Sequence, residues 1–171
     1  MGWLIGILIR LVIPLSILRF PFYGSLLSSL ADTVDVVIWN ALHVQNLSEN
    51  YNLLDKLLDN YFYLIQGYTM LSWKNAIAKK TGFALLIYRS IGLVIYEITK
   101  IRTMLFIFPN IFILFFISYL GYKLYLKKDP IKSTKSSLIF VLILAVPKLI
   151  QEYFFHVKEV NIFRWLMSLV G

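Results

Sequence analysis

A chain of 171 residues that is 59% apolar and 16% aromatic, with a mean hydropathy of +0.73, is too hydrophobic to be an ordinary water-soluble domain. The absence of cysteine excludes disulfides, iron–sulfur clusters and cysteine–zinc sites. The net charge of +8 does not indicate nucleic-acid binding, because the basic residues flank apolar runs, as they do where lysine and arginine contact lipid head groups.

Apolar segments of roughly bilayer length recur along the chain and predict about six membrane-spanning helices. We expect these helices over residues 2–18, 23–42, 51–73, 83–99, 103–126 and 136–157. The fold class that follows is all-α, a multi-pass integral membrane bundle formed by residues 1–157. Residues 158–171 mix aromatic, aliphatic and basic side chains, which is typical of an amphipathic tail at the membrane surface.

The first three predicted helices carry polar residues inside apolar sequence. Arg10 and Pro14 interrupt the first helix, so we expect a kink there and an inward-facing Arg10. Polar residues recur at helical spacing on the next two helices and predict one polar stripe on each. These stripes are Ser25, Ser28, Asp32, Asp35 and Trp39 on the second helix, and Asn52, Asp55, Asp59 and Gln66 on the third.

The last three predicted helices also contain charges. The fourth holds Arg89 and Glu97. We expect a bend in the fifth at Pro109–Asn110, and a loop over the basic segment 74–82 before the fourth. The sixth helix carries three titratable residues at intervals of four: Lys148, Glu152 and His156. A charge inside a membrane costs a few kcal/mol, so a functional role is the first hypothesis for such residues.

A structural role is the alternative for the same charges. In that interpretation Arg10 or Arg89 neutralises Asp32 or Asp35, and Lys148 pairs with Glu152. His156, close to the end of its helix, is then a hydrogen-bonding residue at the membrane interface.

The distribution of basic residues predicts the orientation in the membrane. The connections on one side hold nine basic residues, Arg19, Lys74, Lys79, Lys80, Lys123, Lys127, Lys128, Lys132 and Lys135. The other side holds four, Lys100, Arg102, Lys158 and Arg164. The positive-inside rule therefore places both termini and the connection between the second and third helices outside.

The four aspartates of the second and third helices form a candidate acidic site. Within each pair they lie about one helical turn apart, so each pair can share a face. Four converging carboxylates repel one another unless they are protonated, paired with a basic residue or bound to a cation. Oxygen ligands suit Mg²⁺, Mn²⁺ or Ca²⁺, and such a site can hold a metal against a diphosphate while another carboxylate takes a proton from an alcohol. Serine-hydrolase and glycine-rich phosphate-loop motifs are absent from the sequence.

Asp32-x2-Asp35, followed after nineteen residues by Asp55-x3-Asp59, resembles the CDP-alcohol phosphatidyltransferases, small six-helix membrane enzymes. Their signature, Asp-x2-Asp-Gly-x2-Ala-Arg-x8-9-Gly-x3-Asp-x3-Asp, spans their second and third helices, and their first helix contains an Arg and a Pro. The resemblance implies transfer of a phospholipid group from a CDP-linked lipid, with Mg²⁺ or Mn²⁺ as cofactor. It also implies residue roles: Asp32, Asp35 and Asp55 as metal ligands, and Asp59 as the catalytic base.

The sequence departs from this signature between the two aspartate pairs. Val36 replaces the first glycine, Trp39–Asn40 replaces Ala-Arg, and Tyr51 replaces the second glycine. In the family the site faces the cytosol, whereas the charge distribution here places it outside. The resemblance therefore indicates a divergent or degenerate relative.

Two other functions stay open at this point. One is a non-catalytic subunit of a membrane complex, in which the buried charges are structural and the partner is a second copy or another membrane protein. The other is a cation- or proton-coupled carrier that uses Asp32, Asp35, Asp55, Asp59, Arg89 and Glu97. The sequence has no inverted repeat to favour the carrier.

Overall fold

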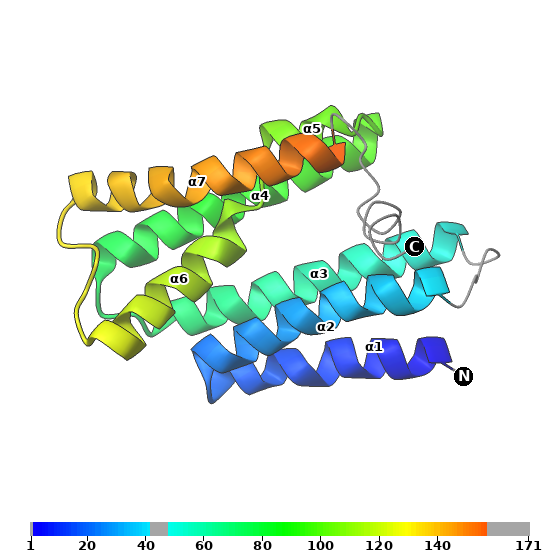
Figure 1. Ribbon diagram of the computed structural model, residues 1–171, viewed down its shortest axis with the longest axis horizontal. Coiled ribbons are helices and arrows are strands. Elements are labelled where there is room, and N and C mark those ends of the chain that lie inside the picture. The colour runs from blue at the N-terminus through cyan, green and yellow to red at the C-terminus, as the bar shows by residue number, and fades with distance from the viewer. Residues whose placement is uncertain (1, 42–47, 157–171) are drawn as a thin grey trace, which may run out of the picture. The chain divides into compact units, whose positions relative to one another are not determined.

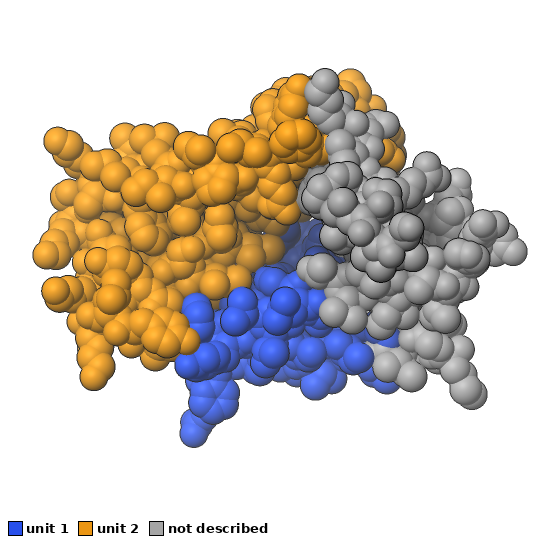
Figure 2. Space-filling view, in the orientation of Figure 1, with its two compact units in different colours: residues 1–72 blue, residues 73–171 orange. Residues whose placement is uncertain are grey.

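The computed structural model describes residues 2–41 and 48–156, and within these ranges every regular element is a helix (Figure 1). Side chains are described for residues 6–32 and 56–154. The chain divides into two compact units, Met1–Ser72 and Trp73–Gly171, which we call the N-terminal and C-terminal units (Figure 2). The predicted tail, residues 158–171, lies outside the described residues.

The N-terminal unit runs back and forth in three helical passes. Its elements are α1 (Gly2–Val12), the 3₁₀-helix η1 (Ile13–Leu18), α2 (Pro21–Ala41) and α3 (Ser48–Leu71). The predicted interruption of the first helix is confirmed: α1 ends at Val12 and the 3₁₀-helix begins with Pro14 in its first turn, since proline has no N–H for the α-helical ladder. Pro21 then occupies the first position of α2, where its fixed φ suits a helix start.

Close contact between η1 and α2 depends on a glycine. A Cβ on Gly24 would lie 2.6 Å from the backbone nitrogen of Ile17, so no larger residue fits there without a shift. The hydroxyl of Ser28, one turn further along α2, donates to the carbonyl of Gly24 at 2.7 Å. Deeper in the unit, the buried Gln66 of α3 donates its amide to Ser25 at 3.2 Å, which joins the two predicted polar stripes.

The C-terminal unit contains α4 (Ala76–Thr99), α5 (Thr103–Ile107), α6 (Ile111–Leu126) and α7 (Thr134–His156). The prediction of a loop over residues 74–82 is wrong, because α4 begins at Ala76. The side chain of Asn75 accepts hydrogen bonds from the amides of Ile77 and Ala78, and this cap starts the helix two turns earlier. The predicted bend at Pro109–Asn110 is confirmed as a break between α5 and α6.

An aromatic cluster forms the core of this unit. The Trp73 ring lies 4.5 Å from that of Tyr119 and 5.4 Å from that of Phe116, and Phe115 stacks on Tyr119 at 6.1 Å. Phe112 is fully buried on the same helix. At one end of the unit, the Asn75 amide donates to the carbonyl of Ile131 at 2.6 Å, so the α6–α7 connection is tied to the start of α4.

Three helical segments are long and apolar enough to cross a membrane: Ala76–Thr99, Thr103–Leu126 and Thr134–Phe154. All three belong to the C-terminal unit. Their outward faces are apolar, as lipid-facing surfaces are, with Ile87, Ile91, Val94 and Ile98 exposed on α4 and Leu138, Leu142, Val146 and Ile150 exposed on α7. In the N-terminal unit, the shorter segment Gly6–Leu18 is also apolar.

Candidate acidic site in the N-terminal unit

Arg10 of α1 joins two aspartates that lie 27 positions apart in the sequence. Its Nη2 lies 2.6 Å from Oδ1 of Asp32 on α2 and 2.8 Å from Oδ1 of Asp59 on α3. The arginine side chain is 5% exposed, whereas the carboxylates are 46% and 33% exposed. In this cluster of three charged residues, the arginine is therefore buried and the two carboxylates are partly exposed.

Several neighbouring contacts hold these three residues in place. The hydroxyl of Tyr61, two residues after Asp59, donates to the carbonyl of Leu11 at 3.1 Å. This bond ties α3 to α1 directly beside Arg10. On α2, Asp32 follows Ser28 by one turn, and Ser28 is anchored to Gly24.

A small cavity adjoins the charges. It measures about 10 Å³, room for about one water molecule. Its lining is Arg10, Pro14, Ser28, Asp32, Leu58, Asp59 and Phe62.

The structure brings together part of the predicted acidic site. Asp32 and Asp59 converge, while the side chains of Asp35 and Asp55 lie outside the described residues, so a four-carboxylate site stays a prediction. Among the side chains that are described, no group of three or more His, Asp or Glu residues has a metal-binding arrangement. The cation between Asp32 and Asp59 is the guanidinium of Arg10.

Sequence reasoning found some of these contacts and missed others. The inward position of Arg10 is confirmed. Its bond to Asp32 is one of the pairings of the structural alternative, in which Arg10 or Arg89 neutralises Asp32 or Asp35. The second bond, from Arg10 to Asp59, was not expected, and neither was the role of Tyr61. A tyrosine two residues after an aspartate on an apolar helix carries no recognisable pattern, so only the packing of α3 against α1 reveals it.

The other predicted intramembrane charges lie in the C-terminal unit. The pairing of Lys148 with Glu152 is confirmed, with Nζ 3.0 Å from Oε1. Glu97 pairs with Lys100 at the exposed end of α4. Arg89 donates from Nη1 to the carbonyl of Phe108 at 2.8 Å. The side chain of His156 lies outside the described residues.

One carboxylate outside the segments of membrane-spanning length has a perturbed pKa. Desolvation acts to raise the pKa of Asp129, in the α6–α7 connection, but it is outweighed. Hydrogen bonds from the Asn75 amide, the Ile131 N–H and the Tyr119 hydroxyl, together with the charge of Lys123, lower the pKa below its usual value. Asp129 is therefore an ionised anchor for this connection.

No protein-family model, no curated protein sequence and no solved structure matches the chain.

Proposed function

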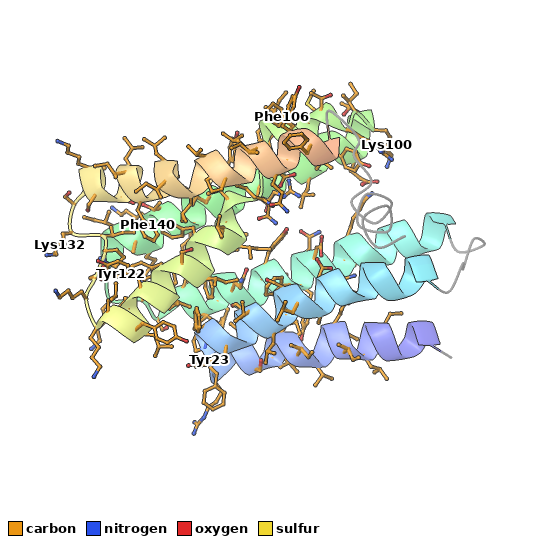
Figure 3. All side chains as sticks on the ribbon, in the orientation of Figure 1. Tyr23, Lys100, Phe106, Tyr122, Lys132 and Phe140 are labelled. Carbon is orange, nitrogen blue, oxygen red and sulfur yellow. The ribbon has the colours of Figure 1, made fainter. Side chains whose placement is uncertain are left out.

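We propose that the chain is a multi-pass integral membrane protein that acts as a non-catalytic, membrane-embedded subunit. Three apolar segments of spanning length, with aliphatic side chains on their outward faces, support the membrane location. The unequal distribution of basic residues between the two ends of the C-terminal unit supports the orientation predicted from the sequence, in which the more basic end is inside. Lysines gather around the start of α4 and the α6–α7 connection, whereas Lys100 and Arg102 lie at the other end, and Figure 3 labels Lys132 and Lys100 at these opposite ends.

The observation that carries the non-catalytic interpretation is the position of Arg10. Its guanidinium bonds both Asp32 and Asp59, and so it takes the place between them that a metal ion would need. The small cavity beside these charges, as the described side chains line it, has room for about one water molecule. A charge cluster of this kind joins three helices and fixes their register.

The test is a double-mutant cycle in the purified full-length protein. Arg10→Met, Asp59→Asn and the double variant are unfolded by denaturant in detergent micelles. A structural pair predicts a coupling energy of about 1–2 kcal/mol, reduced from the value for a fully buried pair because Asp59 is one-third exposed. The exposed pair Glu97 and Lys100 is the matched control and should couple by less than about 0.5 kcal/mol. A coupling near zero for Arg10 and Asp59 would contradict the structural role.

A second candidate function is a divergent CDP-alcohol phosphatidyltransferase. The observation that favours it is the convergence of Asp32 and Asp59, the first and last aspartates of the motif, on one half-open cluster. In this proposal Asp32, Asp35 and Asp55 hold Mg²⁺ or Mn²⁺, Asp59 serves as base, and Arg10 moves aside when metal and a CDP-linked lipid bind.

Ligand-dependent stability separates the two proposals. Thermal unfolding is followed with Mg²⁺ or Mn²⁺, with and without CDP-diacylglycerol or CMP. If the protein is a transferase, the cytidine ligand should raise the unfolding temperature in the presence of metal, because a ligand that binds the native state stabilises it by mass action. This rise should be lost in Asp32→Asn. The transferase also predicts that Asp59→Asn folds normally but abolishes turnover. The structural subunit predicts no shift with any of these ligands, and a lower stability for Asp59→Asn.

A further inference from the structure

The C-terminal unit contains a second buried arginine at an interruption of a membrane-length segment. The apolar segment Thr103–Leu126 is broken at residues 108–110, between α5 and α6. Phe108 follows the five residues of α5, so the break lies about 8 Å from the Thr103 end of this segment. Peptide groups that leave a helix at this depth need other partners, because lipid offers none.

Side chains from α4 and α7 supply those partners. The Tyr88 hydroxyl donates to the carbonyl of Ile107 at 2.5 Å, and Arg89 Nη1 donates to the carbonyl of Phe108 at 2.8 Å. From α7, Glu152 accepts a hydrogen bond from the amide of Asn110 at 3.4 Å. The break is thus held on both sides.

The shape of α4 also fits the break. Gly92, one turn after Tyr88, is buried, and a Cβ on it would lie 2.1 Å from Cβ of Phe108. Phe108 packs into that space, with its ring 4.9 Å from the ring of Tyr88. Phe108, whose carbonyl accepts the Arg89 hydrogen bond, is therefore fixed against α4 by its side chain as well.

The charges around the break do not balance. Glu152 is neutralised by Lys148 at 3.0 Å. Arg89 is 9% exposed, and within the described part of the chain its polar contact is a backbone carbonyl rather than a carboxylate. Its Nε is buried and has no hydrogen-bond partner there. A positive charge left in this state is costly in a membrane, so an anion is the missing counterpart.

We propose that Arg89, at the α5–α6 break, binds the phosphate group of a ligand. Three features favour an oxyanion. A guanidinium has a planar set of donors that matches phosphate. Its Nε and the start of the 16-residue helix α6 both favour negative charge. The break also lies near the head-group level on the side of the exposed Lys100 and Arg102. The phosphate comes either from a phospholipid head group or from a free phosphate. This inference concerns the C-terminal unit and rests on the proposed membrane location, but it does not depend on the role of Arg10.

The test uses thermal unfolding of the detergent-purified full-length protein with four probes at matched ionic strength. These are short-chain phosphatidic acid, inorganic phosphate, short-chain diacylglycerol and chloride. We expect the phosphatidic acid to raise the apparent Tm by about 5 °C near saturation, and the diacylglycerol and chloride to leave it unchanged. A similar rise with inorganic phosphate would identify the phosphate group alone as the ligand, whereas a rise with the lipid only would identify a phospholipid head group.

Variants connect the shift to Arg89. Arg89→Gln should abolish it, and Arg102→Gln, which removes the same charge from an exposed position in the same unit, should retain it. If Arg89→Gln does not fold, Arg89→Lys replaces it, and its affinity should fall about tenfold because the planar set of donors is lost. The proposal is overturned if neither phosphate probe stabilises the wild type, or if the wild-type shift persists in the Arg89 variant.

Discussion

The two units each bury one arginine among apolar helices, but the guanidinium has different partners in each unit. Arg10, 5% exposed, bonds two carboxylates, one from each neighbouring helix. Arg89, 9% exposed, bonds a backbone carbonyl at a helix break. The first arginine is neutralised by its own chain, whereas the second stabilises irregular backbone and keeps an uncompensated charge within the described residues. A buried arginine is thus a structural tie in one unit and a candidate anion receptor in the other.

The largest expected effect is at the break itself. Gly92→Ala places a methyl group against Phe108, so we expect a loss of about 3 kcal/mol in the free energy of unfolding. Denaturant unfolding in detergent measures it. Ile91→Val, at the neighbouring exposed position, is the control and should cost less than about 0.5 kcal/mol. A neutral Gly92→Ala would mean that Phe108 can move away, and that the break does not hold Arg89 rigidly.

Replacing each arginine by methionine should lower the free energy of unfolding by less than Gly92→Ala does, and the loss should be larger for Arg10 than for Arg89. Arg10→Met leaves two carboxylates without their cation and should cost about 2 kcal/mol, which is less than for a fully buried pair because both carboxylates are partly exposed. Arg89→Met leaves one carbonyl without a donor but also removes an uncompensated charge, so the net loss should be less than about 1 kcal/mol in the absence of a phosphate ligand.

The order of these two losses is the decisive result. If Arg89→Met is the more destabilising variant, then the Arg89 side chain stabilises the fold by more than its bond to one carbonyl, and the contrast between the units fails. Urea or guanidinium titrations of both variants under one detergent condition decide this.

The smallest effect concerns Asp129 in the α6–α7 connection of the C-terminal unit. The pKa of Asp129 is lowered in the folded protein, so its contribution to stability is present above the unfolded value of 3.8 and is lost as the pH falls through the folded value. Asp129→Asn should therefore be less stable than the wild type by a few °C or less in Tm at pH 7, since Asp129 is only partly buried. The difference should shrink below about pH 4. A pH-independent difference would assign the effect to Asn75 and Tyr119 packing instead of charge.

The sequence by itself determined the helical class and two positions where the helices are interrupted. Of the six predicted spans, three are long and apolar enough to cross a membrane among the described residues. Hydropathy and proline act locally, so Pro14 ends α1 and the break around Pro109 follows without knowledge of any neighbour. The pairing of Lys148 with Glu152 was also predictable, because residues four apart on one helix always lie on the same face. The start of α4 was missed since a single side chain, Asn75, outweighed the basic composition of the segment that follows it.

Only the tertiary structure decided which charges meet. The sequence pattern around Asp32 and Asp59 does not indicate that both contact Arg10. Their joint contact with it depends on how α1, α2 and α3 pack. Arg89 and Glu97 share one helix, yet one is buried at a helix break and the other pairs with a lysine at the surface. Helical periodicity gives the face on which a residue lies, but the residue that lies opposite depends on contacts between distant parts of the chain, and those contacts are formed by packing.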